Sequence, residues 1–366
     1  MHYSGGSSTG NERVEPSDLP HQEAWKQFEA SVFNLQGLPY RSRDEISDAL
    51  VLGDTSLVLE SNFELFKPSL DEALYWIPSP FPLLQVSKND LLKHALIQER
   101  IQFLNHLRHH QLKYFHHRLS GTTKGTFVYL CHAFGWYPFG HLHDTLQRLY
   151  AVRDIIQSRQ VKFIASDYNM VVNFKQHLSI LADREITNED MIVAKAGQIL
   201  QVENLVIPYS PAVPTTYTPE TYCWIVNKYL SSFDLKVGTS QRIPGIYLSR
   251  NHVLNGSRTV INEVEVIEFL KERGFIVVNG TEPLEIVVKL FHAASIIVGA
   301  HGSLFANIIY SQQNTKIVEY CPDNRRDRSF RDKLKLANDY RQHFMPADSH
   351  HNIRIPLNHL HAELSQ

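Results

Sequence analysis

Cysteine is scarce in this sequence of 366 residues. The three cysteines, Cys131, Cys223 and Cys321, are odd in number and have neither the spacing of a disulfide framework nor that of a zinc site. Such sparse usage favours a reducing compartment. Buried apolar packing is the simplest role for these three thiols.

Long apolar runs are also missing. No run approaches the ~18 residues that identify a membrane-spanning helix. The first twenty residues are rich in glycine, serine and charge, and they lack the apolar core of a signal peptide. We therefore expect a cytoplasmic protein without a transmembrane segment, and peripheral membrane association stays open.

Neither sign of charge dominates. Lysine and arginine number 36 against 38 acidic residues, which gives a formal net charge of −2. This balance provides no basic field for nucleic acid, so nucleic acid is not an expected partner. A run of four arginines forms no more than a local basic patch: Arg325, Arg326, Arg328 and Arg331.

Histidine, by contrast, is abundant, with 20 residues. The densest cluster lies in a predicted helical stretch over residues 89–119 and comprises His106, His109, His110, His116 and His117. His106 and His110 have the i,i+4 spacing of a zinc chelate, but neither a nearby cysteine nor an HExxH pattern supplies further ligands. A solvated basic face is the preferred interpretation, and a histidine-rich metal-dependent hydrolase is the least favoured function.

Residues 246–320 alternate between strand and helix signals. Short apolar runs at 245–250, 275–278, 295–298 and 316–320 predict buried parallel strands, because parallel strands are covered on both faces. Helical periodicity is expected over residues 262–272, 284–293 and 304–310, and Gly274 is a plausible helix stop. This pattern indicates an α/β nucleotide-binding domain.

The turn Gly299-Ala-His301-Gly302-Ser303 joins a buried strand to a helix. Free backbone N–H groups and the helix dipole favour an anion at such a helix start, and two glycines allow close approach. Arg250 and Arg258 supply guanidinium groups that match phosphate oxygens. Together these residues predict a diphosphate site.

Three further residues are candidates for the same site. Glu319 ends a strand near the predicted crevice, where its carboxylate could accept hydrogen bonds from ribose hydroxyls. Asn262 and Glu263 begin a predicted helix, so capping of backbone donors is a sufficient structural role for both.

The ordered set Tyr-Leu-Ser-Arg250, Arg258, Asn-Glu263, Arg-Gly-Phe275, Val-Gly-Ala-His-Gly302 and Val-Glu319 resembles glycosyltransferase family 61. That family includes β-1,2-xylosyltransferases and O-linked N-acetylglucosaminyltransferases. One departure stands out: the family usually has His-Gly-Ala-Gly-Leu-Thr-Asn where this chain has His301-Gly-Ser-Leu-Phe-Ala-Asn307. Loss of the second glycine is expected to reshape the sugar pocket.

A second element, which begins at Gly135-Trp-Tyr-Pro-Phe-Gly, is similar to the family's aromatic-Gly-His-x-x-Asp-x-x-x-Arg-Leu pattern. On a helix starting near Phe139, its His141, Asp144 and Arg148 share one face. Either Asp144 or His141 is expected to act as the catalytic base that takes the acceptor proton. The alternative for Asp144 is a surface ion pair with Arg148.

The resemblance implies an α/β fold of the GT-B type, with two Rossmann-like domains facing a cleft. It also implies an inverting transfer of xylose or N-acetylglucosamine from a UDP-sugar to a hydroxyl of a glycan, glycoprotein or glycolipid, as in polysaccharide biosynthesis. No Asp-x-Asp motif is present, so we expect no metal and no cofactor beyond the donor substrate. The alternative is a non-catalytic nucleotide-sugar-binding module of a glycan-assembly complex.

The domain organisation follows from length and proline content. A chain with 43% hydrophobic residues favours two domains, and prolines between Pro208 and Pro219 predict a linker. We expect a flexible tail over residues 1–20, an acceptor-side domain over 21–215 and a nucleotide-sugar domain over 216–345. A final tail over 346–366 is expected to pack toward the N-terminal domain. The sequence does not indicate an oligomeric state.

Overall fold

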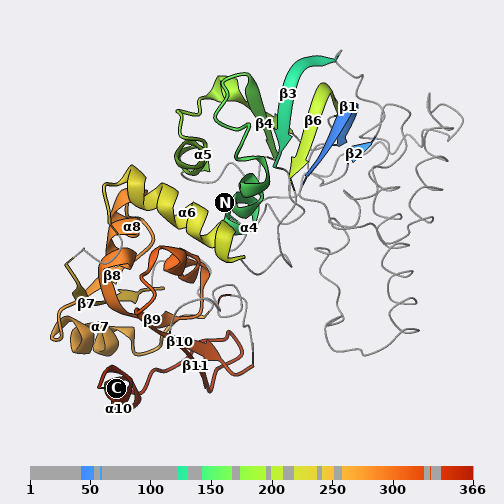
Figure 1. The fold of residues 1–366 in the computed structure, drawn as a ribbon. Coiled ribbons are helices and arrows are strands. Elements are labelled where there is room, and N and C mark those ends of the chain that lie inside the picture. Colours follow the sequence, from blue (N-terminus) through green and yellow to red (C-terminus); the bar gives the residue numbers. More distant parts are fainter. Residues whose placement is uncertain are drawn as a thin grey trace, which may run out of the picture. The chain divides into compact units, whose positions relative to one another are not determined.

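The structure is a computed structural model, shown in Figure 1. It describes residues 43–52, 58–59, 122–130, 142–166, 174–194, 199–208, 218–236, 241–250, 258–324, 330 and 339–365. The predicted N-terminal tail, the histidine-rich stretch, the arginine patch at 325–331 and most of the proline-rich linker lie outside these residues. The described residues divide into two compact units, and the smaller holds residues 46–52, 58–59, 122–124, 194 and 199–205.

Six strands form the first sheet, in the order β2-β1-β6-β3-β4-β5. They are β1 (Arg43–Leu52), β2 (Val58–Leu59), β3 (Thr123–Tyr129), β4 (Val161–Ser166), β5 (Met191–Ala194) and β6 (Ile199–Pro208). Strands β3 and β4 pair in parallel, whereas β1 and β2 pair antiparallel.

Short helices lie in the same part of the chain: α4 (Leu142–Arg148), η3 (Leu149–Val152), α5 (Phe174–Ala182), η5 (Asn188–Asp190) and α6 (Pro219–Ser232). Pro219 starts α6, where a missing N–H costs nothing, and the Thr218 hydroxyl caps the helix by accepting from the Thr221 N–H. Buried side chains of α4, α5 and α6, including Leu146, Leu178 and Ile225, share one apolar core.

The second sheet has five strands in the order β11-β10-β9-β7-β8, and every neighbouring pair is parallel. Its strands are β7 (Ile243–Leu248), β8 (Phe275–Val278), β9 (Ala294–Ala300), β10 (Lys316–Pro322) and β11 (Tyr340–Met345). Its helices are α7 (Glu263–Lys271), α8 (Leu284–Ala293), the 3-10 helix η6 (Ser303–Tyr310) and α10 (Leu357–Leu364). The chain is therefore α/β with two sheets rich in parallel pairs.

Both faces of the second sheet are covered, as the continuous apolar strands predict. Ile246 of β7 and Ile297 of β9 pack on the same side as α8 and η6. The next residue on each strand, Tyr247 or Val298, faces the opposite side, with α7 and α10. Successive strand residues alternate between faces, so two helical layers enclose the sheet (Figure 1).

The elements predicted over residues 245–320 are confirmed, with small shifts at their ends. Gly274 ends the α7 segment with φ of 78°, a left-handed conformation that favours glycine. The helix expected at 304–310 begins one residue earlier and is a 3-10 helix.

Two elements near the C-terminus were missing from the sequence prediction, namely β11 and α10. Helix α10 packs on the second sheet, where the His359 Nδ1 atom lies 3.1 Å from the Tyr320 hydroxyl and Leu360 joins the core. Packing of this tail toward the N-terminal domain stays a prediction. Among the described helices, none combines the length and the apolarity needed to span a bilayer.

Candidate functional site

The strand order of the second sheet locates a ligand site. From β7 the chain moves first to β8 on one side and then to β9 on the other. In doubly wound sheets, ligands bind outside the carboxyl ends of the strands at this reversal of direction. Ser249 and Arg250 follow β7, and His301 and Gly302 follow β9. The two segments predicted to bind diphosphate therefore meet at the reversal point.

Arg250 is buried, with 6% of its surface exposed, and is held at both its backbone and its side chain. Its backbone N–H donates to Oε1 of Glu263 over 3.0 Å. Its Nη1 atom donates to the carbonyl oxygen of His301, also over 3.0 Å. A guanidinium group is thus fixed on the turn after β9.

Two glycines of this turn serve different contacts. A Cβ at position 302 would lie 1.7 Å from Nη1 of Arg250, so the absence of a side chain makes room for the guanidinium group. A Cβ at position 299 would instead lie 2.8 Å from Cβ of Leu248, its neighbour on β7. Gly299 therefore permits close strand packing, a role beyond the anion approach that the sequence suggested.

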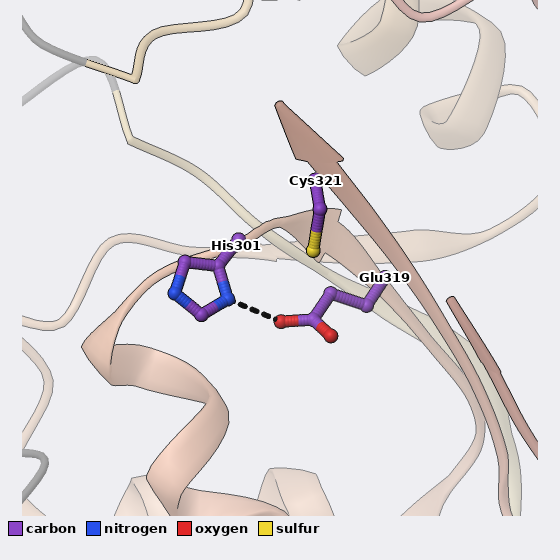
Figure 2. A group of neighbouring side chains, drawn as sticks. All are labelled: His301, Glu319 and Cys321. Atoms are coloured by element: carbon purple, nitrogen blue, oxygen red, sulfur yellow. Dashed lines mark hydrogen bonds and ion pairs between the residues drawn. The ribbon is translucent and has the colours of Figure 1, made fainter. Parts of the chain in front are cut away.

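His301 and Glu319 form a buried pair (Figure 2). The Nδ1 atom of His301 lies 2.7 Å from Oε1 of Glu319, and both residues are at most 3% exposed. Because a carboxylate only accepts, Nδ1 carries the proton of this hydrogen bond. The ring of Phe330 packs on the imidazole, with 5.4 Å between centroids.

The other carboxylate oxygen of Glu319 is also engaged. Oε2 accepts from the Tyr340 hydroxyl over 2.9 Å and from Nε2 of Gln342 over 2.7 Å. Glu319 is fully buried, so a ribose hydroxyl would have to displace one of these donors. In this arrangement Glu319 holds His301, and its predicted contact with ribose stays a prediction.

Cys321 lies beside this pair, with its sulfur directed toward it (Figure 2). The thiol accepts a hydrogen bond from Nε2 of Gln342 over 3.2 Å. Burial raises the pKa of the Cys321 thiol, and the negative charge of Glu319 adds to that rise, against hydrogen bonds from His301 and Gln342. Cys321 is therefore a neutral packing residue, as expected from the sequence, whereas the same expectation was wrong for Cys223, which is exposed.

Glu263 is buried beneath Arg250. Besides the Arg250 N–H, its Oε1 accepts from the Tyr247 hydroxyl over 3.0 Å. Burial raises the pKa of Tyr247 well above its ordinary value, and the charge and hydrogen bond of Glu263 act in the same direction. The phenol therefore stays protonated and remains a donor to the carboxylate.

Asn262 and Arg258 precede Glu263 and have different surroundings. The Asn262 side chain pairs with the backbone of Ile355, donating to its oxygen and accepting from its N–H, both over 3.0 Å. It makes no side-chain cap to α7, so the capping role expected from the sequence is replaced by a tether. Arg258 has φ of 61°, which is uncommon outside glycine, and its Nε is buried without a hydrogen-bond partner among the described residues.

The candidate bases lie elsewhere in the chain. Asp144 falls within α4, but its side chain is outside the description, as is the whole of His141. Arg148 closes the same helix and is 2% exposed. Arg148 is therefore not a surface residue. The catalytic role of Asp144 or His141 stays a prediction.

Two groups of described residues bring three potential metal ligands within 4.8 Å of one another: His301 with Glu319 and Cys321, and His343 with His359 and Glu363. In the first group, Nε2 of Gln342 donates to both Glu319 and Cys321. An N–H group therefore points to the position that a cation bound by these residues would occupy. In the second, Nζ of Lys316 and Nη1 of Arg341 both lie 3.2 Å from Oε2 of Glu363. Each group is better described as a hydrogen-bonded cluster than as a metal site.

Comparison with protein families decides the identity of this region. Residues 139–318 match the family model of Glycosyltransferase 61. The chain carries a glycosyltransferase 61 domain. Its matched segment begins just before α4 and includes Arg250, Arg258 and the whole turn after β9, so the resemblance read from the sequence is confirmed.

The glycosyltransferase 61 match ends at residue 318, one position before Glu319. Tyr340 and Gln342, which hold Glu319, therefore lie beyond it and gave no signal in the sequence. A search of curated proteins finds no match to this chain.

Proposed function

We propose that this glycosyltransferase is an inverting, metal-independent enzyme of GT-B architecture. It transfers a sugar, xylose or N-acetylglucosamine, from a UDP-sugar to a hydroxyl of a glycan or glycoprotein acceptor. One observation carries the proposal: the buried guanidinium of Arg250 rests on the His301-Gly302 turn at the reversal point of a parallel sheet. A fixed cation beside a backbone turn suits a diphosphate.

Arg258 supports the same ligand. Its Nε is a buried donor without a partner among the described residues, and such a group costs about 1–3 kcal/mol when left unsatisfied. A diphosphate oxygen would remove that cost. The left-handed backbone at Arg258 is also typical of a residue under functional constraint.

The proposed reaction is a direct displacement at the anomeric carbon. The acceptor oxygen attacks the anomeric carbon, the bond from that carbon to the diphosphate breaks, and the acceptor proton passes to Asp144 or His141. Arg250, Arg258 and the first turn of η6 stabilise the charge that develops on the departing UDP. A single displacement inverts the anomeric centre.

The test is release of UDP from UDP-xylose and from UDP-N-acetylglucosamine, with and without EDTA. Turnover that survives EDTA and is lost in Asp144→Asn or His141→Gln, with nucleotide affinity retained, supports the proposal. Dependence on added metal would contradict it.

The second candidate, a non-catalytic nucleotide-sugar-binding module, is favoured by one departure from the family. Leu304 stands where the family has a glycine, and it packs on Gly280, where a Cβ would lie 2.8 Å from its Cδ2. Such a module binds UDP but neither transfers nor slowly hydrolyses the donor. Donor hydrolysis by the wild-type chain would eliminate it.

A further inference from the structure

Strand register brings two residues of β11 to the buried carboxylate of Glu319. In the parallel β10–β11 pair, Gln342 stands beside Glu319, and Tyr340 stands beside Ile317. Because side chains two positions apart share a face, Tyr340 and Gln342 both reach the same carboxylate. Both donate to its Oε2, over 2.9 and 2.7 Å.

The hydrogen bonds from Tyr340 and Gln342 offset the cost of burying the Glu319 carboxylate. Glu319 has no exposed surface, and a buried carboxylate is tolerated only when it is paired or well hydrogen-bonded. With Oε2 held by two neutral donors, Oε1 is directed to Nδ1 of His301. The orientation of the imidazole thus depends on the two β11 side chains.

The backbone of His301 connects these contacts to Arg250. The N–H of His301 donates to the carbonyl oxygen of Tyr320 over 2.8 Å, and its ring is held by Glu319. Residue 301 is therefore tied to β10 by both backbone and side chain. Its remaining backbone group, the carbonyl, accepts from Nη1 of Arg250.

We propose that Gln342 and Tyr340 are positioning residues of the donor site, which act on Arg250 through Glu319 and His301. The inference rests on the proposed function, since it takes Arg250 as the residue that holds the diphosphate. It adds two residues that lie outside the family match.

The experiment is a calorimetric titration of the full chain with UDP, for wild type, Gln342→Met, Tyr340→Phe, Arg250→Lys and the double variants with Arg250→Lys. Methionine keeps the length of glutamine but removes its N–H donors. We expect Gln342→Met to weaken UDP binding about tenfold, since a hydrogen bond to a charged group is lost. In the Arg250→Lys background the same change should have a much smaller effect, because the two residues act in one chain of contacts.

A matched control is Gln312→Met. Gln312 is also a partly buried glutamine, and its Nε2 donates to the backbone oxygen of His292 over 3.0 Å, in a loop before β10. This variant should bind UDP like wild type. Thermal unfolding of every variant separates loss of fold from loss of positioning.

The outcomes are distinct. If wild type binds no UDP, the proposed function fails, and this inference fails with it. If wild type binds and the folded Gln342→Met and Tyr340→Phe variants bind equally well, only the positioning role is overturned. Equal losses in the wild-type and Arg250→Lys backgrounds would also overturn it. Should Gln342→Met fail to fold, Tyr340→Phe, which removes one hydroxyl group, decides.

Discussion

The guanidinium group of Arg250 occupies the space that a side chain at position 302 would need. A Cβ on Gly302 would lie 1.7 Å from Nη1 and 2.9 Å from Cζ of Arg250. The same Nη1 donates to the carbonyl of His301, so the arginine packs directly on the backbone of the turn. Arg250 can keep this position only if residue 302 is glycine.

Gly302→Ala should therefore displace Arg250 without unfolding the chain, because the clash is with the end of a flexible side chain. We expect UDP affinity to fall by about 1.5–3 kcal/mol, the contribution of a hydrogen bond to a charged group. Calorimetry measures the loss, and the unfolding temperature should change little. In an Arg250→Lys background the alanine should have a much smaller effect on affinity, and a full additional loss would show that it acts elsewhere.

Tyr247→Phe should lower stability. The change removes a buried donor to Glu263, so that among the described residues only the Arg250 N–H still donates to Oε1. We expect the free energy of unfolding to fall by about 1–3 kcal/mol, as measured by urea denaturation. Tyr150→Phe, at a partly buried ring that packs on Trp224, is the control and should stay within about 0.5 kcal/mol of wild type. Equal stability of the two variants would contradict the role of the hydroxyl.

Glu363→Gln should make the free energy of unfolding less dependent on pH in the acidic range. Burial raises the pKa of Glu363, but the hydrogen bond from Lys316 and the charges of His343, Lys316 and Arg341 outweigh it and hold the pKa below its ordinary 4.5. A carboxyl group with a lowered folded pKa contributes stability above pH 4.5, and this contribution disappears as the pH falls through the folded value.

The measurement is urea denaturation of wild type and Glu363→Gln across this range. The variant should be less stable at pH 7, and the two curves should converge as the pH falls through the folded pKa of Glu363. A stability difference that stays constant with pH would contradict the ion-pair role of Glu363 in docking α10.

Cys321 should resist thiol reagents in the folded protein. It is fully buried, and burial raises the pKa of its thiol, whereas Cys223 is exposed. Reaction requires the thiolate, so a maleimide should label Cys223 readily and Cys321 only after denaturation. Peptide mapping by mass spectrometry resolves the two sites. Rapid native labelling of Cys321 would show that the pairing of β10 with β11 opens.

Much of the second sheet was predictable because its strands are short apolar runs punctuated by glycine and arginine. A parallel strand covered on both faces is a continuous apolar run, and polar residues or glycine mark its ends. The elements from β7 to β10 could therefore be predicted from the local pattern of apolar residues. Strand β11 did not, because Tyr340-Arg-Gln-His-Phe-Met345 is largely polar and half-buried at the sheet edge. Its polar side chains serve contacts within the sheet, which no local pattern reveals.

Part of the candidate site was predictable because its residues lie at the ends of these apolar strands. Arg250 and the turn after β9 stand at strand ends, and the strand order places them together. The capping role given to Asn262 was wrong because its partner, Ile355, lies 93 residues away in sequence. The tie between Glu319 and β11 likewise depends on strand register, which the sequence does not specify.

The most direct measurement is a calorimetric titration of wild type and Arg250→Ala with UDP, with GDP and CMP for comparison, in the presence and absence of EDTA. We expect wild type to bind UDP at micromolar concentrations regardless of EDTA, and Arg250→Ala to fold normally but bind none. Absence of nucleotide binding by wild type, or unchanged binding by Arg250→Ala, would contradict a donor site at the turn after β9.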